Sequence, residues 1–281
     1  MSFTALTYST GSLLTAAKMG QLQANTLATA QNRFKNLIVK NNTSSPSSKL
    51  DITIGSIATQ NYIGTSLTVY ADMALTGSGA NADDGIGGLD TGSEAASTWY
   101  FVHLIYNPTL NRWKAMFSTS RTAPTLPSGY TDWTRIGAIY NSSSSNFVKI
   151  CQVDYMVHYL AYNAADVIIG GSSTTFANVD CSSAVPPTIT MALLNTWFVI
   201  NHNTAGGIFS LTYRQTGVAS GTDDIVQTVE VQVANVEIRA GKVVHWMQLD
   251  GSRTFDYKMS SAATTTTSVN SSVKGYYDPL N

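Results

Sequence analysis

Three closely spaced strand patterns between residues 98 and 141 limit the possible folds of this chain most strongly. Residues 98–107 (TWYFVHLIYN), 112–118 and 133–141 are rich in aromatic and β-branched residues, and turn-forming residues separate them. The first run is apolar at odd and even positions alike, which is typical of a strand covered on both faces. We therefore predict an antiparallel β-sandwich or barrel-like domain with this strand in its interior, and we expect Trp99 to be buried.

Strand patterns continue on both sides of this segment, so we predict a mainly β chain with a short N-terminal α-helix. In residues 50–58, Ile52 and Ile54 alternate with polar or small residues, which is the pattern of a half-buried strand. Glycine and proline interruptions between 161 and 187 favour a boundary there. The predicted parts are a helical docking or oligomerisation arm (1–34), a β-sandwich-like module (35–162), a second β region (163–259) and an extended Ser/Thr-rich tail (260–281).

The first 160 or so residues carry a set of short motifs in a fixed order. These are WY at 99–100, LIYN at 104–107, TAPTLPSGYT at 122–131, RIGAIY at 135–140 and NF at 146–147. Their order resembles a module of tailed-bacteriophage virion proteins of the tail-fibre-like, receptor-binding or head-decoration kind. The resemblance implies a structural component of the virion, assembled in the host cytoplasm, whose partners are other virion proteins and a host surface glycan or receptor. No catalytic residues come with it.

The composition argues against several classes of partner. Charged residues make up only 12% of the chain, and the formal net charge is −1 without any basic run, so binding to a nucleic-acid backbone is not expected. No stretch has the apolar length of a membrane-spanning helix, so we expect no membrane insertion. The cysteines, Cys151 and Cys181, lack metal-ligand spacing and are interpreted as buried thiols.

Residues 12–34 form the predicted helix, and its small residues suggest a role. A narrow stripe of mostly small residues along one side of the helix permits close approach of another backbone, which favours a docking or trimer-forming arm. The alternative is a helix folded over its own sheet. The residues of this stripe are Leu13, Ala16, Ala17, Gly20, Ala24 and Leu27.

Three aspartates in a glycine-rich segment are the main candidate cation ligands, and Asp223-Asp224 is a similar but weaker candidate. Asp83, Asp84 and Asp90 could bind calcium through carboxylate oxygens, but their spacing does not fit an EF-hand loop, and a solvated loop is the simpler interpretation. Asp90-Thr91-Gly92 matches the aspartic-protease tripeptide, yet no second copy is present to supply the paired carboxylate. We therefore predict neither a cofactor nor a catalytic site, and we interpret His103, which lies between apolar residues, as a satisfied core or interface histidine.

Four aromatic residues are candidates for contact with a ligand: Tyr130, Trp133, Tyr140 and Tyr162. Exposed Tyr and Trp stack on sugars and fill partner pockets, whereas burial in the core is the competing explanation. Pro124 and Pro127 exclude the loop 122–130 from an internal strand, and we expect that loop to be structural.

The resemblance, taken with these observations, implies a tail-associated fibre or receptor-binding protein of a tailed phage, and we expect no enzymatic activity. One alternative is a capsid decoration or head-fibre protein, which binds shell subunits. The other is a glycan-cleaving enzyme, which would need two carboxylates flanking a groove, and the sequence offers no such pair.

Overall fold

The computed structural model of the chain describes residues 34–59, 62–74, 86–161, 165–201, 205–219, 221, 225–234, 236–260 and 266–280. Every secondary-structure element assigned within these residues is a β-strand, which confirms the prediction of a mainly β chain. The helix predicted for 12–34 lies outside the described residues. The described part contains no helix that is long and apolar enough to cross a membrane.

The chain forms two compact units that interleave along the sequence. The first contains residues 34–95, 100–138 and 152–154, and the second contains 96–99, 139–151 and 155–280. The glycine and proline interruptions of the sequence predict consecutive domains with a boundary between 161 and 187. The chain instead passes between the units within single strands, which composition cannot reveal.

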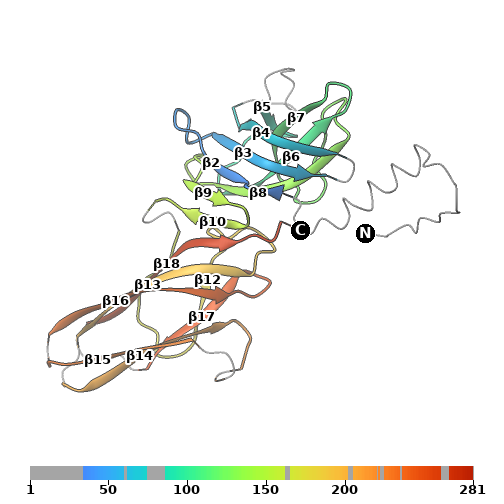
Figure 1. The fold of residues 1–281 in the computed structure, drawn as a ribbon. Coiled ribbons are helices and arrows are strands. Elements are labelled where there is room, and N and C mark those ends of the chain that lie inside the picture. Colours follow the sequence, from blue (N-terminus) through green and yellow to red (C-terminus); the bar gives the residue numbers. More distant parts are fainter. Residues whose placement is uncertain are drawn as a thin grey trace, which may run out of the picture. The chain divides into compact units, whose positions relative to one another are not determined.

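The first unit is a curled sheet of mostly antiparallel strands (Figure 1). Its order is β2-β3-β4-β5-β7-β6-β8, β1 pairs with β3, and the pairs β4–β5 and β5–β7 are parallel. The strands are β1 (Phe34–Lys35), β2 (Ile38–Asn41), β3 (Lys49–Ala58), β4 (Ile63–Asp72), β5 (Ile86–Leu89), β6 (Thr98–Asn107), β7 (Arg112–Ser118) and β8 (Asp132–Asn141).

Burial in this unit follows the predicted patterns. In β3, Ile52 and Ile54 are buried while Thr53 is exposed, and β6 is buried on both faces from Tyr100 onward. The sheet curls far enough for Gln152 of β9 (Ile150–Val153) to donate a hydrogen bond from Nε2 to the Ile136 carbonyl of β8, at 2.8 Å. The strand predicted to be covered on both sides is therefore confirmed.

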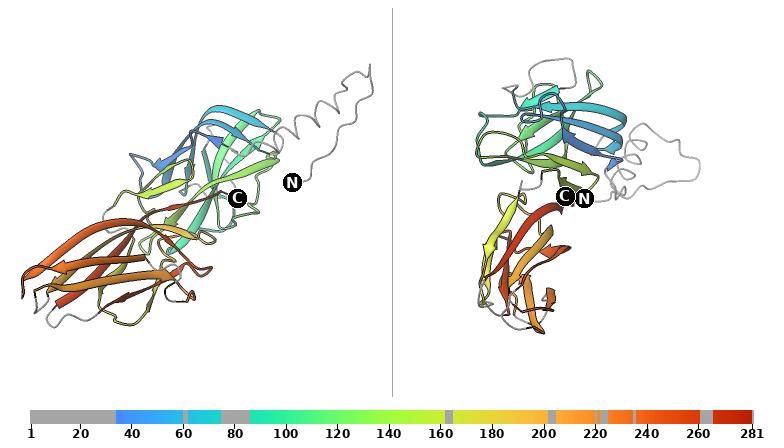
Figure 2. Two further views of the ribbon diagram at one scale, coloured as in Figure 1. Left: turned by 60° about the horizontal axis from the view of Figure 1, so that its bottom comes forward. Right: turned by 90° about the vertical axis from the view of Figure 1, so that its left-hand side faces the viewer.

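The second unit is a sandwich of two sheets (Figure 2). One sheet has the order β16-β13-β18-β10, with β11 also pairing with β18, and the other has the order β12-β17-β14-β15. The strands are β10 (Met156–Tyr159), β11 (Asp166–Gly171), β12 (Ala177–Asp180), β13 (Met191–Asn201), β14 (Gly207–Gln215), β15 (Ile225–Val231), β16 (Glu237–Gln248), β17 (Thr254–Met259) and β18 (Thr266–Tyr277).

The inner face of β14 fixes which of its residues point outward. Phe209, Leu211 and Tyr213 are buried between the sheets. Tyr213 donates a hydrogen bond from its hydroxyl to Thr196 Oγ1 of β13, at 2.9 Å. Because side chains alternate across a strand, Thr212 and Arg214 lie on the outer face of the four-stranded sheet.

The C-terminal segment differs from the predicted extended tail. Thr266–Tyr277 forms β18, which pairs with β13 on one side and with β10 and β11 on the other. Val269, Ser271 and Val273 are almost completely buried. Serine and threonine dominate this segment and hide the short apolar alternation, although small and β-branched residues fit an interior strand well.

Candidate functional site

Several predicted site residues lie outside the described part of the chain. They are Leu13, Ala16, Ala17, Gly20, Ala24 and Leu27 of the docking stripe, Asp83 and Asp84 of the acidic loop, and the aromatic residue Tyr162.

Asp90, the third aspartate, is not solvated, and its side chain binds the backbone of the loop 122–130. Its side chain is buried, with Oδ1 accepting a hydrogen bond from the Thr91 amide at 2.7 Å and Oδ2 accepting one from the Thr125 amide at 2.9 Å. In the described residues no cluster of three or more His, Cys, Asp or Glu side chains is arranged to hold a metal ion. The interpretation of Asp90 as part of a solvated loop is therefore wrong, because both oxygens bind backbone amides.

The predicted ligand-contact aromatics do not converge on one site. Tyr130 and Trp133 belong to the first unit and Tyr140 to the second, and all three are half-buried. The Trp133 ring packs edge-on against His103, with 5.3 Å between centroids. The Tyr140 ring lies 5.1 Å from that of Trp99. In each of these two pairs the aromatic side chain packs against another ring of its own unit.

Trp99 is half-buried, so the prediction that it is buried is wrong. It belongs to the second unit, where its indole Nε1 donates a hydrogen bond to the Ser182 carbonyl at 2.8 Å. Its ring also packs edge-on against Tyr276. The position near the start of β6 explains the partial exposure.

The two cysteines are both free thiols. Cys181 is buried as predicted, and burial raises its pKa to about 12. Cys151 is only half-buried, which corrects the prediction for that residue.

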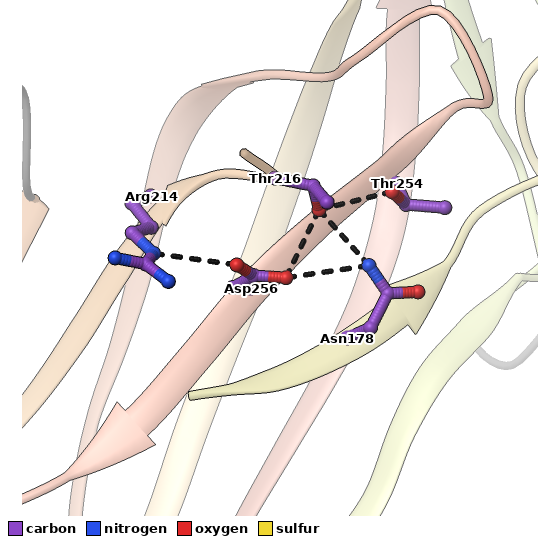
Figure 3. Close-up of polar contacts among 5 residues, drawn as sticks. All are labelled: Asn178, Arg214, Thr216, Thr254 and Asp256. Carbon is purple, nitrogen blue, oxygen red and sulfur yellow. Dashed lines mark hydrogen bonds and ion pairs between the residues drawn. The ribbon is translucent and has the colours of Figure 1, made fainter. Parts of the chain in front are cut away.

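The strongest candidate site is a polar network on the outer face of the four-stranded sheet, centred on Asp256 (Figure 3). The register of β17 places Asp256 opposite Asn178 of β12 on one side and opposite Arg214 of β14 on the other. Phe255 and Tyr257 point inward, so Asp256 points outward although only 7% of it is exposed. Three strands therefore supply one connected row of side chains.

Both carboxylate oxygens of Asp256 accept hydrogen bonds. Oδ2 accepts from Arg214 Nε at 3.3 Å, and Oδ1 accepts from Thr216 Oγ1 at 3.0 Å and from Asn178 Nδ2 at 3.3 Å. Asn178 Nδ2 also donates to Thr216 Oγ1 at 2.9 Å, and the Thr254 hydroxyl donates to the same oxygen at 2.9 Å. A carboxylate held by three donors fixes its neighbours in place, and Arg214 is the charged group that it orients.

An aromatic ring completes the cluster. The guanidinium carbon of Arg214 lies 3.6 Å from the ring centroid of Phe176, and Lys258 Nζ lies 4.3 Å from the same centroid. Two cations are thus packed against one ring, a favourable arrangement because the ring face carries negative charge density. Chemically, this cluster offers positive charge with fixed donors, which suits binding of an acceptor group.

Sequence reasoning did not find this network, although part of the signal was present. The segment 254–258 reads Thr-Phe-Asp-Tyr-Lys, in which polar residues alternate with aromatic ones and so share one face of a strand. Nothing in the sequence pairs Asp256 with Asn178 or Arg214, because the register between distant strands is set by the fold.

A second surface feature is the edge strand β16. In the described part of the chain it pairs only with β13, so its other side has no neighbouring strand. Val243, Val244 and Trp246 of this strand are 37%, 58% and 37% exposed. We call these three residues and the open backbone of β16 the β16 edge.

Comparison with models of known protein families finds no match, and comparison with curated proteins finds no significantly similar sequence.

Proposed function

We propose that this chain is a structural and receptor-binding component of a tailed-phage virion, most simply a tail-associated fibre protein, without a catalytic role. The resemblance of the motifs between residues 99 and 147 supports it. So does a charge-poor chain whose described part is built of β-strands, because strands that present hydroxyl, amide and apolar groups suit repeated packing against neighbouring subunits.

The β16 edge is the observation that carries this proposal. A long edge strand with exposed apolar side chains presents unpaired N–H and C=O groups, which another strand can satisfy, and natural monomers usually protect such edges. Here the edge carries Val244 and Trp246 on the outer face of its sheet, and aromatic residues are enriched where proteins meet.

The proposed occupant is another copy of this chain. A formal net charge of −1 gives copies little reason to repel one another. The proposed assembly is a homotrimer, in which the β16 edge adds to contacts made by the arm of residues 1–34.

The mass of the protein in solution tests assembly. The parent chain should give a multiple of 30.1 kDa by light scattering at micromolar concentration. The double variant Val244→Lys/Trp246→Lys should give a smaller mass, because lysine on an exposed edge opposes strand pairing. The control Leu110→Lys, which changes an exposed residue in the turn after β6, should behave as the parent does. A monomeric parent, or a double variant with the parent's mass, would contradict assembly through this edge.

A further inference from the structure

We infer that Arg214 and Lys258 form a subsite for an anionic group of an acidic polysaccharide, that is, a carboxylate, sulfate or phosphate carried on a sugar. This inference rests on the proposed receptor-binding function and names the chemistry of the ligand. It is carried by the geometry around the guanidinium, by the closeness of a second cation and by the hydroxyl and amide groups beside them.

The Arg214 guanidinium is oriented before any ligand arrives. Asp256 Oδ2 holds Nε, and the ring of Phe176 lies against the guanidinium plane. Neither Nη atom makes a hydrogen bond within the described part of the chain. Four N–H donors therefore remain in a fixed fork, the geometry that binds a planar or tetrahedral oxyanion through two parallel hydrogen bonds. A side chain that is already ordered loses less entropy when it binds.

Lys258 adds a second positive charge at the same place. It lies diagonally across from Arg214, since Thr212 is the register partner of Lys258 and Asp256 that of Arg214. The cluster thus holds two cations and one carboxylate, and Asp256 bonds to Arg214 while no described acidic residue pairs with Lys258. Both cations lie close to the same ring, so an anion bound at the Arg214 guanidinium would be attracted by both charges.

The neighbouring neutral groups favour a sugar as the carrier of the anion. Thr216, Thr254 and Asn178 form a hydrogen-bonded row on the same outer face (Figure 3). Hydroxyl and amide groups both donate and accept hydrogen bonds, as sugar hydroxyls do. A nucleic acid also carries phosphates, but it is bound through an extended basic surface, and this chain has a net charge of −1.

Direct binding measurements on the full chain test the subsite. The probes are a uronic-acid oligosaccharide, a sulfated oligosaccharide and a neutral oligosaccharide of equal length, together with a single-stranded oligonucleotide of equal charge. We expect at least one acidic saccharide to bind about tenfold more tightly than the neutral one, with affinity falling as salt is raised. The comparison between the uronic-acid and sulfated probes identifies which anion the subsite prefers.

Two variants locate the binding. Arg214→Gln and Lys258→Gln should each weaken the acidic saccharide about tenfold and leave the neutral one unchanged. The matched control is Lys49→Gln, because Lys49 Nζ also lies over a ring, that of Tyr70, at 5.2 Å. Arg214→Gln leaves Asp256 without its cation, so its thermal midpoint is measured as well. Lys258→Gln removes no side-chain hydrogen bond to a described residue and tests the subsite without that complication.

Three results would overturn the inference. They are no preference for an acidic saccharide, tighter binding of the oligonucleotide than of any saccharide, and unchanged affinity in both the Arg214 and Lys258 variants. In the last case saccharide binding itself, and with it the receptor-binding function, would persist at another site. A different result would contradict the receptor-binding function itself: the parent chain binds none of the saccharides and does not adsorb to host cells.

Discussion

At the scale of single residues, His103 shows how burial changes chemistry. The side chain is fully buried in β6, its Nε2 lies 2.9 Å from the Ser120 carbonyl, and its ring packs against Trp133. Burial lowers the pKa of His103 from 6.5 to about 4, although the hydrogen bond to Ser120 acts in the opposite direction. The neutral ring therefore donates from Nε2, whereas its buried Nδ1 has no hydrogen-bond partner among the described residues, so the interpretation as a satisfied core histidine holds for only one ring nitrogen.

The lowered pKa of His103 predicts loss of stability in acid. Between pH 6.5 and about 4, His103 is protonated in the unfolded chain but stays neutral in the folded chain. The free energy of unfolding therefore falls as pH falls through this window. Across this window the pKa shift of His103 lowers the free energy of unfolding by about 3 kcal/mol in total. Unfolding in denaturant at a series of pH values should show that His103→Gln flattens this part of the curve. His158→Gln, at an exposed position, should leave it unchanged. Equal pH curves for parent and His103→Gln would contradict this account.

At the scale of elements, the loop 122–130 is fixed by contacts within its own unit. Asp90 binds the Thr125 amide, the Tyr130 amide donates to the Pro127 carbonyl, and Pro124 is buried. Gly129 has a φ of +82°, and a Cβ there would lie 2.7 Å from Asn107 Nδ2, so a larger residue would be strained and would require Asn107 to move. These contacts support a structural role for the loop.

Asp90→Asn tests the attachment of this loop. Its amide group can replace only one of the two carboxylate acceptors, so an N–H would face the Thr125 or Thr91 amide. We expect a loss of about 1–3 kcal/mol in the free energy of unfolding, the usual cost of an unsatisfied buried group. Thermal unfolding with Thr122→Ala, an exposed change in the same loop, provides the reference. A variant as stable as that reference would show that Asp90 does not hold the loop.

Elements with local signals could be predicted from the sequence, and elements defined by distant pairing could not. The bounds predicted for the runs 98–107 and 112–118 coincide with β6 and β7, because turn residues flank both. The burial alternation in β3 was likewise readable. The site was not, since Asn178 and Asp256 are 78 residues apart in sequence and meet only through the register of β12 and β17. The strand β18 was missed because its serines conceal its buried positions.

At the scale of the whole molecule, interleaved units explain why domain boundaries escaped prediction. Residues 96–99 and 139–151 belong to the second unit, although the chain around them builds the first. Each unit has its own buried core, and low charge is common to the entire sequence. A chain of this kind fits a role in which surfaces are covered by other subunits, which is the proposal made above.

The most direct test of the central claim is antibody labelling of phage particles, viewed by electron microscopy. An antibody against the second unit, checked for binding to the folded protein, should decorate the tail of intact particles. Label on the capsid would favour the decoration or head-fibre alternative. Particles that carry no label, with the chain also absent from their denatured protein, would contradict the proposal that it is a virion component.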